Sequence, residues 1–454
     1  MVNRELLDAA EVLLLPEFLL LPDGPVRDHA VVVADGVFRA VGPAAEVVAA
    51  HRELDPVRLD GRLLMPGFVD AHHHLTQSFG KSLAFGEPSE IFRRIWVPLE
   101  GALTEENAYV AAKLAALEAL RGGFTTVSEA GTRAPVDVGV VAAATQDAGI
   151  RCVLGRVCDG PDEEHLARWA DSPLVHPSLA IPIPEAAPDG VLRDVSRLCA
   201  EAGAVFQIHV NEHLASVERS LEAHGRRPLE HLHEIGALGP QVLAAHATLL
   251  TPTEVRLLAD TGAAISYNPV ASGWKGNAVA PAELLSVLGV RFGLGTDGTR
   301  GDAFRLVDAA ELAQRLGFGL SSGDSSCGGG WTWLEHATAL GADAVGLGGF
   351  TGEIAVGRAA DFLVVDLQVP ELCPSWDLSW ELVRLANRDQ IAAVFVGGRL
   401  RLWRGWPIGW DGPELVAQAA KMAREVVERA PLRRIHPVSV EHRSRVSTGI
   451  GGRA

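Results

Sequence analysis

Cysteine is scarce in this chain: there are five residues among 454, and none of them forms a Cys-x-x-Cys pair. A small, odd number of scattered cysteines argues against a disulfide framework and favours free thiols in a reducing compartment. Long apolar runs are also missing, because the run at residues 12–21 is short and carries Pro16 and Glu17. It follows an acidic start, so neither a signal peptide nor a membrane span is predicted. We expect a cytoplasmic protein.

Positive charge is in short supply as well. The 40 Lys and Arg residues are outnumbered by 57 Asp and Glu residues, which gives a formal net charge of −17. This balance argues against a nucleic-acid partner, whose phosphates require basic patches, and against docking on an anionic membrane surface. Apolar residues make up 48% of the chain and charged residues 21%, so a large buried core is expected rather than disorder.

The two ends of the chain share a β-rich texture. The first part, up to residue 63, consists of short apolar runs separated by Asp-Gly turn signals, and a similar texture returns over residues 353–412. Neither end offers enough strands for a sheet of its own, so we predict that they pair in one small composite β-sandwich. Residues 413–454 are expected to form a C-terminal helix, over 413–430, followed by a poorly ordered basic tail.

Between these ends, residues 64–352 alternate between β-branched apolar runs and helix-like stretches. Eight such runs can be counted, and most are followed by a helical pattern such as the one at residues 104–123, with Thr104 as its cap and Gly122 near its end. Strand–helix alternation repeated eight times predicts a (β/α)₈ TIM-type barrel.

Polar residues gather at the ends of these eight runs. Barrel enzymes build their sites from the carboxyl ends of the strands, so these side chains are expected to converge on one rim. One histidine at a strand end is usually structural, but four histidines, acids and an amide together predict a functional site. In chain order these residues are His72, His74, Glu129, His209, Glu212, His246, Asn268 and Asp297.

The histidines point to a metal ion. In the extended segment Ala-His-His-His, residues two apart face the same side, so His72 and His74 can point into the barrel mouth while His73 points away. The apolar lead-in at residues 63–70 argues that this segment is buried and not a surface loop. Together with His209 and Asp297, these histidines form a set that suits one Zn²⁺ first, with Fe²⁺ as the alternative, rather than Mg²⁺ or Ca²⁺.

Several motifs now resemble one family. PGFVDAHHHLTQ, HVNEH, AHATL, GTDG and TGEIAVGRAADFLVVD are similar, in order and spacing, to the amidohydrolase superfamily, in the branch of guanine, cytosine and S-adenosylhomocysteine deaminases and triazine hydrolases. The resemblance covers about residues 60 to 400 and implies the same barrel and sandwich. It implies metal ligation by His72, His74, His209 and Asp297. It also implies that Glu212 is a proton shuttle, His246 a polarising catalytic group that acts with Asp297, and Gln77 a substrate contact.

Some features depart from that family. Members with two metals commonly carry a bridging Lys on the fourth strand, which is absent here, so one metal is predicted; Glu129 is the carboxylate that could change this. The segments 182–184 and 265–277 match the relatives only loosely, and both are expected to line the pocket. Trp96, Asn268 and Trp274 are further predicted substrate contacts, although Trp96 fits equally well as a cover of the barrel rim.

An alternative metal motif has to be weighed. His209-Val-Asn-Glu-His213 fits the HxxEH pattern of inverted zinc proteases, in which both histidines bind zinc from a helix. The lead-in AVFQIHV has the character of a strand, so we expect His213 not to be a ligand.

These observations predict a mononuclear metal-dependent hydrolase of carbon–nitrogen bonds other than peptide bonds. The expected reaction is deamination of an amino-substituted heterocycle, such as a purine, pyrimidine, pterin or triazine, with release of ammonia. One rival uses the same site to cleave a cyclic amide or to displace chloride or alkylamine, and another is a non-catalytic scaffold. The expected partners are a small-molecule substrate and a second copy of the chain in a homodimer, with neither nucleic acid nor membrane.

Overall fold

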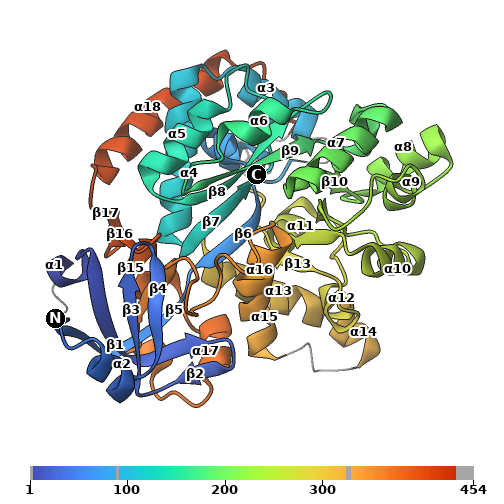
Figure 1. Cartoon of the computed structure of the whole chain (residues 1–454). Helices are drawn as coiled ribbons and strands as arrows, with labels where there is room; N and C mark the ends of the chain where they lie inside the picture. Colours follow the sequence, from blue (N-terminus) through green and yellow to red (C-terminus); the bar gives the residue numbers. More distant parts are fainter. Residues whose placement is uncertain (1–3, 88–90, 324–328, 436–454) are drawn as a thin grey trace, which may run out of the picture.

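The structure is a computed structural model that describes residues 4–87, 91–323 and 329–435 (Figure 1). The predicted basic tail therefore lies outside the described residues from position 436 onward. Within the described part, no helix is long and apolar enough to cross a membrane.

Eight parallel strands of the described chain form the barrel predicted from the sequence, in the order β6 to β13. All eight are lined with buried residues, which explains their continuous apolar character. The strands are β6 (Phe68–His73), β7 (Phe124–Glu129), β8 (Arg151–Val157), β9 (Val175–Ile181), β10 (Phe206–Val210), β11 (Val242–His246), β12 (Ala264–Tyr267) and β13 (Phe292–Leu294).

One buried carboxylate closes the seam between the two end strands, β6 and β13. Asp70, on β6, accepts hydrogen bonds from the backbone N–H of Thr296 at 2.9 Å and from its hydroxyl at 2.5 Å. It also accepts one from the backbone N–H of His72 at 3.2 Å. The backbone N–H of Asp297 then donates to the carbonyl of His72 at 2.8 Å. The seam thus brings the ends of β6 and β13 into register.

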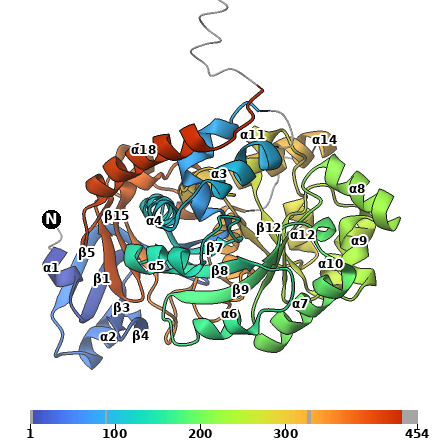
Figure 2. The ribbon, with the colours of Figure 1, turned by 90° about the horizontal axis from the view of Figure 1, so that it is seen from above.

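Helices surround this barrel (Figures 1 and 2). In α4 (Glu105–Arg121), the Thr104 hydroxyl accepts the N–H of Asn107 and Gly122 follows the last turn, as the sequence predicts. The others are α3 (Val97–Gly101), α5 (Gly139–Ala148), α6 (Glu163–Arg168), α7 (Asp189–Ala202), α8 (Leu214–His224), α9 (Pro228–Glu234), α10 (Pro252–Thr261), α11 (Pro269–Lys275), α12 (Ala282–Val287), α13 (Ala303–Gln314), α14 (Leu320–Ser322), α15 (Gly330–Ala337) and α16 (Ala339–Ala344).

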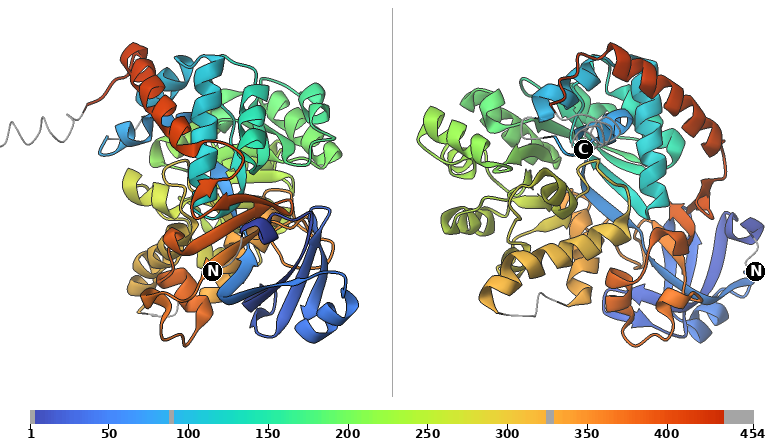
Figure 3. Two further views of the ribbon diagram at one scale, coloured as in Figure 1. Left: turned by 90° about the vertical axis from the view of Figure 1, so that its left-hand side faces the viewer. Right: turned by 180° about the vertical axis from the view of Figure 1, so that it is seen from behind.

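The strands of the two chain ends lie side by side in one mixed sheet, as predicted (Figure 3). Its centre is the antiparallel pair β5–β14, and Phe38 of β4 packs on Phe362 of β14 at 5.7 Å between ring centroids, so the sheet folds over itself. The strands are β1 (Glu11–Leu21), β2 (Gly24–Val26), β3 (His29–Ala34), β4 (Val37–Pro43), β5 (Pro56–Pro66), β14 (Phe362–Asp366), β15 (Ile391–Val396), β16 (Arg399–Trp403) and β17 (Trp406–Pro407).

Four helices complete the ends of the chain: α1 (Arg4–Leu7), α2 (Ala44–Ala50), α17 (Leu378–Arg384) and α18 (Gly412–Arg429). The last of these is the predicted C-terminal helix, and it packs against α4 on the outside of the barrel (Figure 2). Because β5 runs on to Pro66, the sheet and the barrel meet within a few residues, and we keep the division at 63/64 and 352/353 as a proposal.

A buried ion pair joins the sheet to the barrel. Arg151, at the start of β8, donates to both oxygens of Asp361 at 2.8 and 3.1 Å, and both side chains are almost fully buried. Asp361 also accepts from the Thr351 hydroxyl and from the backbone N–H of Gly397, so one carboxylate ties three segments together. Such a bidentate pair adds geometric specificity as well as energy.

Removing one partner of this pair leaves an uncompensated buried charge. We expect Arg151→Met to lower the free energy of unfolding by about 3–5 kcal/mol, measured by urea denaturation. The matched control is Arg197→Met, because Arg197 pairs with Glu201 in an exposed ion pair and its loss should cost less than about 1 kcal/mol. Equal stability of the two variants would contradict the role of Arg151 at the junction.

Candidate metal centre

The carboxyl ends of the strands bring together all four predicted ligands. His72 and His74 come from the end of β6, His209 from β10 and Asp297 from the turn after β13. His246, at the end of β11, joins them. These residues form two overlapping groups, His72–His209–His246 and His72–His74–Asp297. Within each group, one potential ligand atom from every residue lies within 4.8 Å of the others.

Three of the distances among the four predicted donor atoms match those around one tetrahedral ion. Asp297 Oδ1 lies 3.4 Å from His72 Nε2 and 3.4 Å from His74 Nε2, and His209 Nε2 lies 3.4 Å from His74 Nε2. Ligands at the zinc–nitrogen distance of about 2.0–2.1 Å on a tetrahedron are about 3.3–3.4 Å apart. His72 Nε2 is buried and has no hydrogen-bond partner among the described residues. The donor set therefore fits Zn²⁺.

Two of the ligand imidazoles, those of His74 and His209, are held neutral, as ligation requires. Burial lowers the pKa of His74 to about 3, and burial together with the neighbouring imidazoles holds the pKa of His209 well below its usual range. His209 Nδ1 lies 2.8 Å from the carbonyl of Pro182, so Nδ1 carries the proton and Nε2 presents its lone pair to the ion. The loosely matched segment 182–184 thus supports a ligand directly.

His246 is held in the opposite tautomer. The Ser266 hydroxyl donates to Asn268 Oδ1 at 2.7 Å, which orients the amide so that its Nδ2 donates to His246 Nδ1 at 3.2 Å. Nε2 of His246 then carries the proton, and it lies 3.9 Å from Glu212 Oε2. Burial lowers the pKa of His246 to about 4, so the ring is a neutral donor. Asn268 supports His246 and is not among the residues that line the cavity, and its role as a substrate contact stays a prediction.

Backbone strain accompanies the site. Asn211, His246 and Asp297 have positive φ angles of 51°, 73° and 55°, and each lies at or just after the end of a barrel strand. Non-glycine residues rarely adopt this conformation, and it clusters at functional sites. The strained turns aim the side chains of this rim inward.

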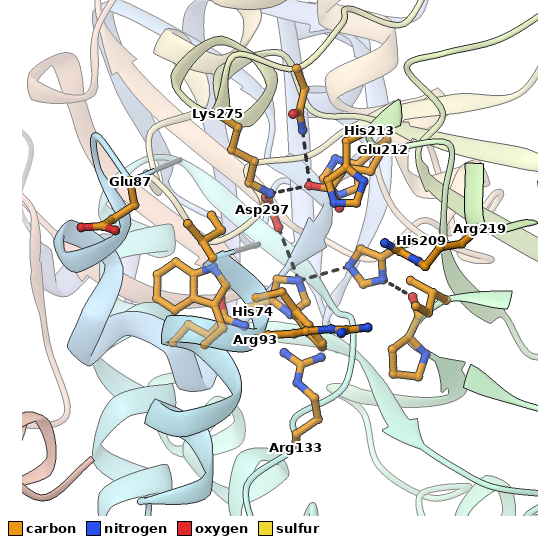
Figure 4. A pocket seen from close by; sticks show the side chains of 18 residues that line it. His74, Glu87, Arg93, Arg133, His209, Glu212, His213, Arg219, Lys275 and Asp297 are labelled. Atoms are coloured by element: carbon orange, nitrogen blue, oxygen red, sulfur yellow. Dashed lines mark hydrogen bonds and ion pairs between the residues drawn. The ribbon is translucent and has the colours of Figure 1, made fainter. Parts of the chain in front are cut away.

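Lys275 lies between the two catalytic carboxylates. Its ammonium group donates to Glu212 Oε1 at 2.9 Å and to Asp297 Oδ2 at 2.5 Å (Figure 4). Burial acts to raise the pKa of both carboxyls, but Lys275 and the nearby imidazoles hold both pKa values below the usual range. Both groups are therefore ionised at neutral pH. No sequence motif singles out Lys275, because its role depends on the two carboxylates that the fold brings to it.

Glu129 lies apart from the ligand groups. Its carboxylate accepts the backbone N–H of Leu75 at 2.6 Å and that of Gly131 at 3.0 Å, and burial raises its pKa to about 7. It holds the backbone just after His74. His73 also turns away, with Nδ1 against Asp70 at 2.8 Å. Neither residue occupies a place beside the ion.

The cavity above the ligands is lined by two of the predicted contacts, Gln77 and Trp96, while Trp274 packs its ring on Phe85 at 5.3 Å instead. No sequence pattern singles out the charged residues that line this cavity, because in the sequence they look like ordinary solvent-exposed charges on loops. These are Glu87, Arg93, Arg133, Arg219 and Lys275, and His213 joins them (Figure 4).

Arg133 is the most firmly anchored of these arginines. Its Nε donates to Glu100 at 2.8 Å, and the buried Glu100 also accepts the hydroxyl of Thr76 at 2.9 Å. Nη2 of Arg133 is buried without a hydrogen-bond partner among the described residues. An arginine held at one end in this way presents its remaining donors to the cavity.

A second group of potential ligands, Asp189, His224 and His231, lies outside the barrel mouth. The two rings stack nearly face to face at 3.7 Å between centroids. The rings of the metal centre are 4.7–5.5 Å apart, and His72 meets its neighbours edge to face. Asp189 is exposed and already lies 3.0 Å from His231 Nε2, whereas the residues of the main centre are buried or half-buried, so this group lacks the enclosed setting of the main centre.

Comparison with known proteins shows which family this chain is similar to. A model of the amidohydrolase family matches residues 63–401. The chain is 32% identical over 413 residues to a 5-methylthioadenosine/S-adenosylhomocysteine deaminase of Syntrophobacter fumaroxidans, covering 86% of this chain and 92% of the relative. It is 30% identical to a 5′-deoxyadenosine deaminase of Methanobrevibacter smithii, covering 81% and 87%.

Solved structures agree in fold. An adenosine deaminase from Xanthomonas campestris with bound zinc superposes with a TM-score of 0.84 at 28% identity, over 92% of this chain and 98% of the other. The zinc complex of an atrazine chlorohydrolase from Arthrobacter aurescens has a TM-score of 0.80 at 20% identity, over 91% and 100%, and shares the fold. With the family model matching most of its length and a relative above 30% identity, the chain belongs to the amidohydrolase family.

Proposed function

We propose that this protein is a zinc-dependent hydrolytic deaminase that removes the amino group of an adenine-type nucleoside and releases ammonia. The observation that carries the proposal is the position of Glu212 and His246, which flank a donor set spaced for one tetrahedral ion. The relatives named as deaminases of methylthioadenosine, S-adenosylhomocysteine and 5′-deoxyadenosine supply the substrate class.

His72, His74, His209 and Asp297 would hold the ion in this mechanism. A bound zinc ion supplies Lewis acidity, which lowers the pKa of a coordinated water from about 16 to about 7. Glu212 Oε2 is the oxygen that faces this space, because Oε1 is engaged by Lys275. Glu212 therefore takes the proton of the reacting water and delivers it to the ring nitrogen next to the amino-bearing carbon.

His246 acts on the other side of the same space. Its Nε2–H donates toward the oxygen that adds to the ring carbon. Asp297 accepts the remaining proton of that oxygen and passes it to the amino group as the carbon–nitrogen bond breaks. One carbon–oxygen bond forms, one carbon–nitrogen bond breaks, and the amino group leaves as ammonia. Water supplies the oxygen and both protons, so no further reactant is needed.

The rival reaction at the same site is displacement of chloride or alkylamine, or hydrolysis of a cyclic amide. The atrazine chlorohydrolase shares the fold at 20% identity, which does not extend to its substrate. Release of ammonia from a nucleoside separates deamination from these rivals, and absence of bound metal from the purified protein would support a scaffold. The expected homodimer and cytoplasmic location stay predictions.

The cavity favours a nucleoside with an acidic substituent. Arg93, Arg133 and Arg219 line it, and Arg219 has only a 3.7 Å ion pair with Glu185. S-adenosylhomocysteine carries a carboxylate, whereas 5′-deoxyadenosine and methylthioadenosine do not. We therefore propose S-adenosylhomocysteine, or a nucleoside with a similar acidic side chain, as the preferred substrate.

Metal content tests the mononuclear centre. Elemental analysis should give about one zinc per chain, since the four donors gather around one position. Removal of zinc with a chelator should abolish ammonia release, and one equivalent of zinc should restore it. A value close to two would contradict the mononuclear centre, because Glu129 would then have to leave the backbone of Leu75 and Gly131.

Glu212→Gln tests the proton shuttle. The amide keeps the shape of the side chain but cannot accept the proton, so turnover should fall by at least about 10²–10⁴-fold. Zinc content should stay the same, because Glu212 is not among the four donors. His213→Ala is the companion variant and should also keep its zinc. Loss of zinc from His213→Ala but not from Asp297→Ala would favour the protease-type ligand set instead.

Arg219→Gln tests the acidic-substrate proposal. Hydrogen bonds to charged groups contribute about 1.5–3 kcal/mol, so kcat/KM for S-adenosylhomocysteine should fall by about tenfold or more. The value for 5′-deoxyadenosine should change by no more than about twofold. Arg226→Gln, just beyond the end of α8 and outside the cavity lining, is the matched control. Equal losses for both nucleosides would exclude recognition of the acidic group by Arg219.

A further inference from the structure

We propose that Lys275 is a positioning residue whose ammonium group holds one carboxylate oxygen of Asp297 and one of Glu212. This leaves the other oxygen of Asp297 for zinc and the other oxygen of Glu212 for proton transfer. The inference rests on the proposed zinc centre and adds a residue that neither the motifs nor the comparisons single out. Lys275 is the last residue of α11, and its side chain is 13% exposed, so the ammonium is held inside the site.

The two oxygens of Asp297 have different surroundings. Oδ1 lies 3.4 Å from the Nε2 atoms of both His72 and His74, on the side where the ion fits. Oδ2 accepts the Lys275 ammonium at 2.5 Å. Without Lys275, the carboxylate could rotate and present either oxygen, or both, to the ion. The lysine thus selects one oxygen as the ligand.

Glu212 is divided in the same way. Oε1 accepts from Lys275 at 2.9 Å and from Asn277 at 3.5 Å, whereas Oε2 faces His246 Nε2 at 3.9 Å. The Lys275 ammonium therefore holds Oε1 of Glu212 and Oδ2 of Asp297. It also separates two buried negative charges that would otherwise repel each other across the site.

The element that carries Lys275 strengthens this arrangement. α11 begins directly after Asn268, whose amide orients His246, and ends at Lys275. The residue that precedes this short helix therefore orients His246, and the last residue of the helix orients both carboxylates. The Trp274 ring, 5.6 Å from the ammonium, packs on Phe85 and closes the outer side. Because residues that orient metal ligands commonly matter as much as the ligands, removal of Lys275 should weaken the zinc centre itself.

Zinc affinity is the decisive measurement, because it needs no substrate. Lys275→Met keeps the length of the apolar stem but removes the ammonium. Titration of the zinc-free protein against a competing chelator should show affinity lowered by about 10–100-fold, the range typical of outer-shell partners. With zinc in excess, kcat should fall more than KM rises, because Glu212 loses its fixed orientation. Lys81→Met is the matched control, since Lys81 pairs with Glu118 away from the donors, and its zinc affinity should equal that of the wild type.

A second variant separates positioning from packing. In Lys275→Ala, added propylammonium restores the missing stem and charge, and it should recover part of the zinc affinity. A defect of folding would not respond to it, and circular dichroism identifies that case. A folded Lys275→Met that binds zinc as tightly as the wild type would overturn the proposal. So would tighter binding, which would mean that the positive charge only repels the ion. A wild-type protein that binds zinc but deaminates no nucleoside would instead count against the proposed function alone.

Discussion

The carboxylate of Asp70 is the constraint on which the rest of this site depends. The ladder of the barrel has two end strands, and Asp70 joins them by accepting from the backbone and hydroxyl of Thr296. The adjacent bond from Asp297 N–H to the carbonyl of His72 places a ligand of the last strand beside a ligand of the first. Because Asp70 is fully buried and has several donors, its charge is compensated where it lies.

The lining of the cavity contains several cationic side chains, although the whole chain has a negative net charge. The protein carries a formal net charge of −17, yet its cavity contains Arg93, Arg133, Arg219 and Lys275. An overall negative surface disfavours phosphate-rich polymers, while a local cluster of cations attracts a small acidic group. Under the proposed function, the arginines of the cavity would pair with the carboxylate of a nucleoside substituent.

The segments 182–184 and 265–277 support the side chains of the site. Pro182 accepts the Nδ1 proton of His209, and residues 268–275 orient His246, Glu212 and Asp297. These supports act through backbone carbonyls and through the ends of long side chains. Such groups can come from different residue types, so the sequence of a supporting segment can vary while the ligands it orients stay the same.

Local sequence patterns were enough to predict the barrel, the pairing of the two ends and the positions of metal-ligand residue types at strand ends. Period-two alternation separates His72 and His74 from His73, and burial shows as continuous apolar runs, so both are local signals. The tertiary structure decided which distant side chains meet. Lys275 lies between Glu212 and Asp297, Asn268 turns to His246 rather than to the cavity, and Glu129 binds backbone N–H groups. These outcomes depend on barrel closure and on strained turns such as those at His246 and Asp297, which no local pattern encodes.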